Sequence, residues 1–271
     1  MKVGIDVRIL SYPITGIGRY TLEMCRALSD IKGVSLYLYS PSPINNNIVS
    51  GLESATIRTH SWNNVLLRQF WSETYLPLWA KKDDLDVFWG PSHRIPRFLS
   101  SRIARIVTIH DLVWKCAKET MHPTTYFLER FKMPTAVREA DLIVVDSYST
   151  KDAVIKEFVV KRQNISVIPL ATGNIQNTLS FDSLKKYGID KPYFLFVGTL
   201  EPRKNLANLL SAYAGLSISN KSKAMFIIAG GKGWGRVNLK EIITQLDLTE
   251  NVKILGYVDD ATLALSLIHI S

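Results

Sequence analysis

The feature that most constrains this chain is a repeated alternation of short apolar runs with amphipathic segments. Runs of strand length occupy residues 3–9, 34–39, 56–60, 86–89, 105–109, 142–145 and 165–168. Segments with apolar residues spaced three and four apart lie between them, at 17–28, 63–82, 124–138 and 150–158. Strands separated by helices of this length form parallel sheets with right-handed crossovers. The first half of the chain therefore has the pattern of an α/β domain.

The pattern is interrupted once and then starts again. Residues 171–180 are rich in Gly, Asn, Thr and Ser and have little periodicity, which indicates a linker. A second series follows, with helices expected at 182–187, 204–214 and 239–245 and strands at 193–197, 225–229 and 252–255. We therefore predict two doubly wound parallel-sheet domains that face a cleft, residues 1–172 and residues 173–271.

Several classes of protein are disfavoured by what the sequence lacks. It has no apolar run of about 18 residues, the length that a membrane-spanning helix needs. Asp6 and Arg8 interrupt its first apolar run, so the start does not resemble a signal peptide. Cys25 and Cys116 are too few for a disulfide framework and are expected to be reduced, Cys25 on a helix and Cys116 beyond a strand. We expect a cytoplasmic protein.

The net charge of +9 is compatible with phosphate-bearing ligands, nucleic acid or an anionic membrane surface. The basic residues are scattered and occur in short pairs, such as Lys81-Lys82 and Arg203-Lys204. A nucleic-acid-binding protein would more often have a long basic block or zinc-ligand spacing. We therefore expect no nucleic acid partner.

In an open parallel sheet, ligands bind beyond the carboxyl ends of the strands. The first such segment is Thr15-Gly16-Ile17-Gly18-Arg19-Tyr20, between the first strand and its helix. Gly16 and Gly18 would allow the backbone to approach a ligand, and the helix start would offer free N–H groups to an anion. A tight turn that only starts a helix is the alternative. The spacing is not GxGxxG, which disfavours a dinucleotide site.

The second segment is His110-Asp111, at the end of the strand at 105–109. An imidazole in this position can donate a hydrogen bond to a substrate hydroxyl. A histidine that packs under a loop and bonds to a neighbour is an equally good interpretation of the position alone.

The third segment is Gly198-Thr199-Leu200-Glu201-Pro202-Arg203-Lys204-Asn205, which follows a strand and opens a helix. Arg203 and Lys204 place positive charge at the positive end of the helix dipole, which is normally unfavourable. An anionic ligand such as a diphosphate would remove the conflict. The alternative is that Arg203 and Lys204 are an exposed surface pair, which would leave the conflict in place. Two further strand ends carry Gly230 in Gly-Gly-Lys-Gly-Trp and Tyr257 in Leu-Gly-Tyr-Val. Either could be a ligand loop or an ordinary turn.

Taken in order, these segments resemble the retaining glycosyltransferases of the GT-B fold, specifically glycosyltransferase family 4. The matching residues are 6–8 with 16–20, 107–112, 140–149, 167–169, 196–199 with 201–205, and 255–258. The resemblance runs from residue 1 to about 265. It implies two Rossmann-like domains, an acceptor-side domain and a donor-binding domain.

The resemblance also implies roles for the residues singled out above. Gly16 and Gly18 would lie against the donor phosphates or the acceptor, His110 would hydrogen-bond the donor sugar, and Arg203 and Lys204 would hold the diphosphate. Gly230 and Tyr257 would belong to the donor site. Transfer would retain the anomeric configuration and would need no divalent metal and no cofactor, because cationic side chains and helix N-termini would stabilise the leaving group.

The family implies a nucleoside diphosphate sugar as donor, with GDP-mannose as the first guess, and a glycan or lipid-linked acceptor in polysaccharide or lipopolysaccharide synthesis. A lipid-linked acceptor would also imply a peripheral contact of the protein with the inner face of the membrane. The aromatic segment 63–82 could lie near such an acceptor. A helix packed in the core is the preferred account of that segment.

The chain departs from the family near its end. The family's pair of glutamates eight positions apart is absent, and residues 266–271 have no counterpart in the resemblance. We therefore expect a second domain truncated near Leu265 and a chain with little transferase activity. Two other functions stay open: a sugar-nucleotide epimerase of the same fold, and a non-catalytic fragment that binds a nucleotide or glycan.

Overall fold

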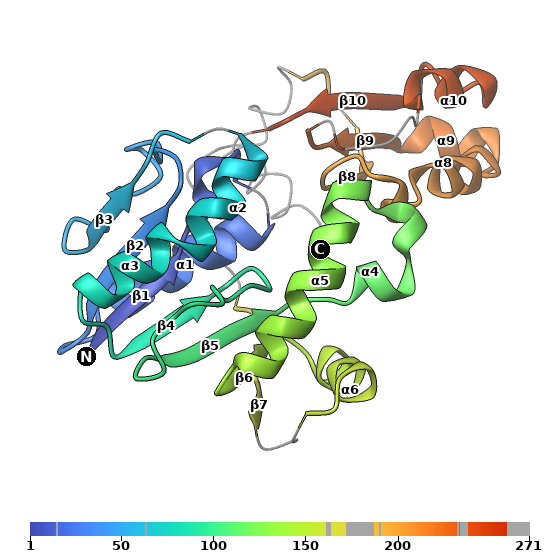
Figure 1. Ribbon diagram of the computed structural model, residues 1–271. Coiled ribbons are helices and arrows are strands. Elements are labelled where there is room, and N and C mark those ends of the chain that lie inside the picture. Colours follow the sequence, from blue (N-terminus) through green and yellow to red (C-terminus); the bar gives the residue numbers. More distant parts are fainter. Residues whose placement is uncertain are drawn as a thin grey trace. The chain divides into compact units, whose positions relative to one another are not determined.

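The computed structural model describes residues 1–14, 16–62, 64–160, 164–171, 187–189, 191–231, 233 and 238–258 (Figure 1). The chain divides into two compact units. The first comprises Met1–Lys118 and Pro123–Thr172, and the second comprises Glu119–His122 and Gly173–Ser271. Each unit is built around its own parallel sheet.

The sheet of the first unit has seven strands in the order β3-β2-β1-β4-β5-β6-β7, all parallel. Its strands are β1 (Lys2–Asp6), β2 (Ser35–Ser40), β3 (Thr56–Thr59), β4 (Val87–Gly90), β5 (Ala104–Ile109), β6 (Leu142–Val145) and β7 (Ile165–Val167). The order runs outward from β1 in one direction and then from β4 in the other. This reversal is the doubly wound arrangement expected from the sequence, and it places the ligand edge at the carboxyl ends of β1 and β4.

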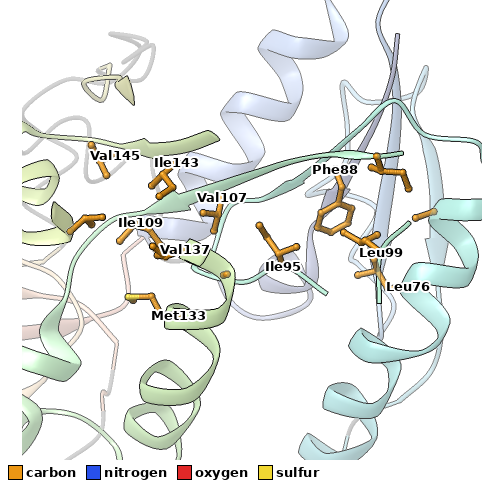
Figure 2. Packing of buried hydrophobic residues seen from close by; sticks show 14 of the residues in the cluster. Leu76, Phe88, Ile95, Leu99, Val107, Ile109, Met133, Val137, Ile143 and Val145 are labelled. Atoms are coloured by element: carbon orange, nitrogen blue, oxygen red, sulfur yellow. The ribbon is translucent and has the colours of Figure 1, made fainter. Parts of the chain in front are cut away.

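Helices connect these strands. They are η1 (Arg8–Ser11), α1 (Gly16–Ser29), α2 (Val65–Glu73), α3 (Tyr75–Lys82), α4 (Val113–Cys116), η2 (Lys118–Thr120), α5 (Pro123–Glu139) and α6 (Tyr148–Glu157). The sheet separates two apolar clusters. One packs α1 against Ile5 and Leu38, and the other packs α2, α3 and α5 against Phe88 and Val107. Figure 2 shows Leu76 of α3 and Met133 of α5 in this second cluster.

Two expectations for the first unit were wrong in detail. The first strand ends at Asp6 and not at residue 9, because the chain turns into η1 where the Arg8 guanidinium binds the Asp6 carboxylate. The single helix expected at 63–82 is two helices that meet at Thr74. Pro77 has no N–H, and its ring would collide with the carbonyl of residue 73 in a continuous helix. The break before Pro77 removes that collision.

The described residues of the second unit form three parallel strands in the order β10-β9-β8. They are β8 (Tyr193–Val197), β9 (Met225–Ala229) and β10 (Val252–Gly256), joined by η4 (Pro202–Lys204), α8 (Leu206–Ala214), α9 (Ile218–Lys223) and α10 (Leu239–Gln245). The helix expected at 204–214 begins later, because η4 and Asn205 precede it. Leu210, Phe226 and Ile243 pack α8 and α10 against the sheet.

Some expectations concern residues outside the described part of the chain. These are most of the linker at 171–180, the helix at 182–187 and everything after Val258. The expected truncation near residue 265 and the expected loss of activity therefore stay predictions.

Candidate functional site

A pocket of about 860 Å³ lies at the carboxyl ends of the strands of the second unit. Its walls come from η4, the start of α8, the loops after β9 and β10, and the start of α10. The residues that line it are Leu200, Glu201, Pro202, Asn205, Leu206, Ala207, Gly230, Gly231, Gly233, Asn238, Leu239, Lys240, Ile254, Gly256 and Tyr257. Gly230 and Tyr257, two of the residues predicted from the sequence, are thus brought together.

The floor of this pocket is a tight crossing of backbone segments. The Gly230 N–H donates to the Gly256 carbonyl at 2.7 Å, and the Gly198 N–H donates to the Ala229 carbonyl at 3.0 Å. A Cβ added to Gly230 would lie 1.9 Å from the Gly198 carbonyl oxygen. Glycine at 230 is therefore required by the close approach of the loops that follow β8 and β9.

The start of α8 forms one wall of the pocket. Asn205 precedes the helix in the left-handed conformation (φ 55°), and its side chain makes no capping hydrogen bond. The first N–H groups of α8 therefore donate no hydrogen bond to that side chain. Because Asn205, Leu206 and Ala207 line the pocket, the positive end of the helix dipole is available to an anion there.

Arg203 and Lys204 lie beside this wall, in η4, but their side chains are not part of the pocket lining. The Arg203 Nε atom lies 2.6 Å from Glu201 Oε2, so its charge is shared with a carboxylate that the sequence analysis had not given a role. Within the described part of the chain, the Lys204 ammonium has neither a hydrogen bond nor an ion pair. Tyr257 is 69% exposed, so its ring is available to a ligand.

In the first unit, His110 follows β5 and lies among oxygen acceptors. Its Nε2 atom lies 3.0 Å from the Pro91 carbonyl oxygen, and its Nδ1 atom lies 3.4 Å from Asp146 Oδ2. Burial lowers the pKa of His110. Since both ring nitrogens already face oxygens, a hydrogen bond to a sugar hydroxyl requires His110 to give up one of these two contacts.

His93 supports His110 and was missed by the sequence analysis. The His110 backbone N–H donates to His93 Nε2 at 3.0 Å, and His93 Nδ1 lies 3.1 Å from Glu129 Oε2. Burial opposes ionisation of Glu129, but the hydrogen bonds from His93 and Arg94 and the charge of Arg94 outweigh it and lower the Glu129 pKa. No local pattern could have found this pairing, because Glu129 lies on α5, 36 residues from His93.

Gly16 and Gly18 lie at the start of α1. A Cβ at Gly16 would meet no atom within 4 Å, and one at Gly18 would make an ordinary 3.6 Å contact with Ile14. Neither glycine is required by packing in this conformation. The same helix carries Tyr20, whose ring lies edge-on to the His110 ring at 4.9 Å, so the start of α1 and His110 belong to one site.

Two further observations bear on metal ions and membranes. Among the described residues, no three His, Cys, Asp or Glu side chains gather as a set of metal ligands. Metal-independent transfer nevertheless stays a prediction. No helix in the described part of the chain is both long enough and apolar enough to cross a membrane.

Known families match both units. The family model for Glycosyltransferase Family 4 matches residues 14–172. The family model for Glycosyl transferases group 1 matches residues 181–269. The second match continues past residue 265, where the resemblance had been expected to end.

Individual relatives match nearly the whole chain. O-antigen chain mannosyltransferase B of Escherichia coli is 26% identical over 281 residues, which cover 97% of this chain and 73% of the relative. The crystal structure of Anabaena Alr3699/HepE in complex with UDP and glucose has a TM-score of 0.69 at 18% identity, covering 96% of this chain and 70% of that chain. The crystal structure of WaaG, a glycosyltransferase involved in lipopolysaccharide biosynthesis, has a TM-score of 0.69 at 12% identity. The match covers 98% of this chain and 72% of WaaG.

Proposed function

The chain belongs to glycosyltransferase family 4 and has the GT-B fold, and from this we propose which reaction this glycosyltransferase catalyses. It moves a hexose from a nucleoside diphosphate sugar to a glycan or lipid-linked acceptor, in the synthesis of a cell-surface polysaccharide such as an O-antigen. Transfer retains the anomeric configuration. The observation that carries this proposal is the pocket at the carboxyl ends of β8, β9 and β10.

The pocket has the chemistry that a nucleoside diphosphate requires. The uncapped start of α8 and the cations of η4 suit the two phosphates. The exposed Tyr257 ring offers a stacking surface for a base. Mannose is the proposed sugar because the O-antigen relative is a mannosyltransferase. GDP-mannose is accordingly the proposed donor.

In the proposed reaction the bond between the anomeric carbon and the diphosphate oxygen breaks. A bond from the acceptor hydroxyl to that carbon forms on the same face of the sugar, and the hydroxyl proton passes to the departing diphosphate. The role proposed for the chain is electrostatic: Arg203, Lys204 and the α8 N-terminus stabilise the charge that develops on the leaving group. His110 orients the sugar once one of its contacts to Pro91 or Asp146 is released.

Two measurements test this proposal. Titration calorimetry should show that GDP binds the wild type and binds the Arg203→Gln/Lys204→Gln double variant about tenfold more weakly. Lys223→Gln, an exposed substitution on α9 away from the pocket, should bind GDP like the wild type. Equal binding of GDP by all three proteins would contradict the proposal that Arg203 and Lys204 belong to the donor site.

Product analysis separates the alternatives. With GDP-mannose and a glycan acceptor, a transferase forms a glycoside whose anomeric configuration NMR identifies. An epimerase would change the sugar without an acceptor. A binding fragment would hold GDP without turning over any donor. Either of the last two results would replace the transferase proposal.

We also propose that the chain contacts an anionic membrane surface through the outer faces of α2, α3 and α5. These helices turn one face to the core, as Trp71 and Met133 show, yet their opposite faces are apolar too. Leu66 is 78% exposed and Phe131 is 65% exposed. The exposed apolar residues, here named the outer helical surface, are Val65, Leu66, Leu67, Phe70, Leu78, Phe98, Phe127 and Phe131.

Glu73 ties the parts of the outer helical surface together. Its carboxylate pairs with Lys132 of α5 and accepts the Arg97 N–H, so the segments that carry Phe131 and Phe98 are held to the end of α2. In segments 64–82, 94–98 and 123–139 the exposed charged residues are all basic: Lys81, Lys82, Arg97, Arg130 and Arg138. Aromatic and aliphatic side chains with a basic surround suit the interface of an anionic bilayer.

A further inference from the structure

A cluster of arginines lies under the ligand edge of the first sheet, outside every site assigned above. Arg8 follows β1, Arg94 follows β4, and Arg68 comes from α2. Their acidic neighbours are Asp6, which is 1% exposed, and Glu129, which is 8% exposed. Three guanidinium charges therefore meet two carboxylates, and the nearby His93 is neutral because its Nε2 accepts a backbone N–H.

Arg8 and Arg94 use both carboxylates. Arg8 binds Asp6 through Nε at 2.9 Å and 2.8 Å and through Nη2 at 2.5 Å. Arg94 pairs with Glu129 at 3.4 Å. Even so, Arg8 Nη1 and Arg94 Nε are buried without a hydrogen-bond acceptor. The cluster thus has donors to spare after its own carboxylates are satisfied.

Arg68 carries the uncompensated charge. It is 6% exposed, and among the described residues no carboxylate lies within 4.0 Å of its guanidinium. Its acceptors are neutral: Ser11 Oγ at 2.9 Å, Ser42 Oγ at 3.3 Å and the Arg8 carbonyl oxygen at 3.3 Å. A buried charge held only by neutral oxygens is costly, because they do not replace its hydration. The same hydroxyl and carbonyl oxygens could accept hydrogen bonds from a neutral glutamine. The need to satisfy these acceptors therefore does not explain why a charged residue occupies position 68.

The cover over Arg68 is thin and movable. The Tyr12 ring stacks on the guanidinium at 4.3 Å but is itself 47% exposed. The segment from Ser11 to Ile14 leads to the start of α1, where Gly16 leaves open space. Rotation of the Tyr12 side chain would uncover the Arg68 guanidinium, whose planar fork of N–H donors favours a tetrahedral oxyanion.

We propose that Arg68, supported by Arg8 and closed over by Tyr12, binds a phosphate group of the acceptor. This proposal rests on the proposed function for the identity of the acceptor, but not for the binding of phosphate itself. The positive charge of Arg68 attracts the phosphate. A phosphate oxygen then contacts the face of the guanidinium that the Tyr12 ring covers in this structure. The acceptor phosphate is then anchored on the same sheet edge as His110.

The test is titration calorimetry of the full chain with two probes, inorganic phosphate and a water-soluble prenyl phosphate. The Arg203→Gln/Lys204→Gln background is used so that the proposed donor site does not contribute. Arg68→Gln should weaken binding of phosphate about tenfold or more, whereas Arg102→Gln, a substitution of an exposed arginine elsewhere in the first unit, should leave it unchanged. Tighter binding of the prenyl phosphate would identify a lipid-linked source, and equal binding a water-soluble one.

Arg68→Lys guards against a folding defect, because it keeps the charge and should retain most of the affinity. Tyr12→Ala, an exposed substitution, should speed association with phosphate. The proposal is overturned if Arg68→Gln and Arg102→Gln bind phosphate equally, or if folded Arg68→Lys and Tyr12→Ala both bind like Arg68→Gln. Phosphate binding that depends on Arg68 in a chain that fails to bind GDP would instead retain this site and remove the proposed function.

Discussion

The backbone N–H of His110 donates to Nε2 of His93 at 3.0 Å. This bond fixes the protonation of His93, because the accepting nitrogen must be unprotonated and the proton must lie on Nδ1, which faces Glu129. His93 adopts the left-handed conformation (φ 63°), which a non-glycine residue rarely takes. The end of β5 and helix α5 are therefore joined through the buried imidazole of His93, a residue whose backbone is strained.

Replacement of His93 should destabilise the first unit. His93→Ala leaves the His110 N–H and the Glu129 carboxylate without their partner and keeps the backbone strain, so we expect a loss of about 2–4 kcal/mol. Urea denaturation measures the free energy of unfolding. His93→Asn tolerates the left-handed conformation and should lose less. A change below about 0.5 kcal/mol for His93→Ala, the level of an ordinary surface substitution, would contradict the role given to this bond.

His110 should be neutral at physiological pH. Burial lowers its pKa, so the unfolded chain binds a proton at a higher pH than the folded chain does. The neutral form contributes stability above the ordinary histidine pKa, and that stability is lost as the pH falls from about 6.5 toward the folded value. NMR titration of the imidazole should give a midpoint below 6.5, and a midpoint above it would refute the prediction.

Gly230→Ala should disrupt the pocket of the second unit. The new Cβ would lie 1.9 Å from the Gly198 carbonyl oxygen, which is backbone and cannot swing away. We expect a loss of at least about 2 kcal/mol in unfolding free energy and loss of GDP binding. Gly231→Ala is the matched control, since its Cβ would meet nothing within 4 Å although it lines the same pocket. Similar effects from both substitutions would show that the close approach of Gly230 to the Gly198 carbonyl oxygen is not what requires glycine at position 230.

The order of strands and helices could be predicted from the sequence because it depends on local periodicity. Strands such as Leu142–Val145 and Met225–Ala229 were predicted with the bounds that the structure shows. The break at Thr74 could have been inferred from Pro77, whose effect on the preceding turn is a local property.

The side-chain partners could not be predicted, because they come from distant parts of the chain. His93 and Glu129 are separated by 36 residues, and Arg8 and Ser72 by 64. Only the crossover geometry brings them together. Likewise, the basic pair in η4 suggested an anion site, but nothing in the sequence showed that Glu201 shares the charge of Arg203.

The Asp83 carboxylate should make the first unit sensitive to acid. It accepts hydrogen bonds at 2.8 Å from Tyr39 Oη and from Arg58 Nε. Burial opposes ionisation, but the bonds from Arg58 and Tyr39 outweigh it and lower the Asp83 pKa. A depressed folded pKa contributes stability above the unfolded value near 4, and this is lost as the pH falls below it.

Asp83→Asn removes that titration. The wild type should lose more unfolding free energy than Asp83→Asn when the pH is lowered from neutrality to about 3. Urea denaturation at both pH values checks this. Asp30→Asn, a substitution of an exposed carboxylate directly after α1, should follow the wild type. Parallel losses in the wild type and Asp83→Asn would place the acid sensitivity elsewhere.

Contact with an anionic bilayer should depend on the outer helical surface. Co-sedimentation is expected with vesicles that contain phosphatidylglycerol, less with phosphatidylcholine alone, and less again at high salt. Phe70→Ser/Phe131→Ser removes two exposed rings from neighbouring helices and should weaken binding about tenfold or more. The matched control is Ile218→Ser, because Ile218 is more exposed than either phenylalanine but lies on α9 of the second unit.

The same variants distinguish a membrane from another partner. Analytical ultracentrifugation of the wild type should show a monomer in the absence of vesicles. If it shows a dimer that Phe70→Ser/Phe131→Ser dissociates, the surface is an interface between copies of this chain. If the double variant sediments with vesicles as the wild type does, the exposed rings have no part in the contact. Weaker sedimentation in Arg97→Gln/Arg130→Gln would show that the basic surround acts with the rings, as an anionic surface requires.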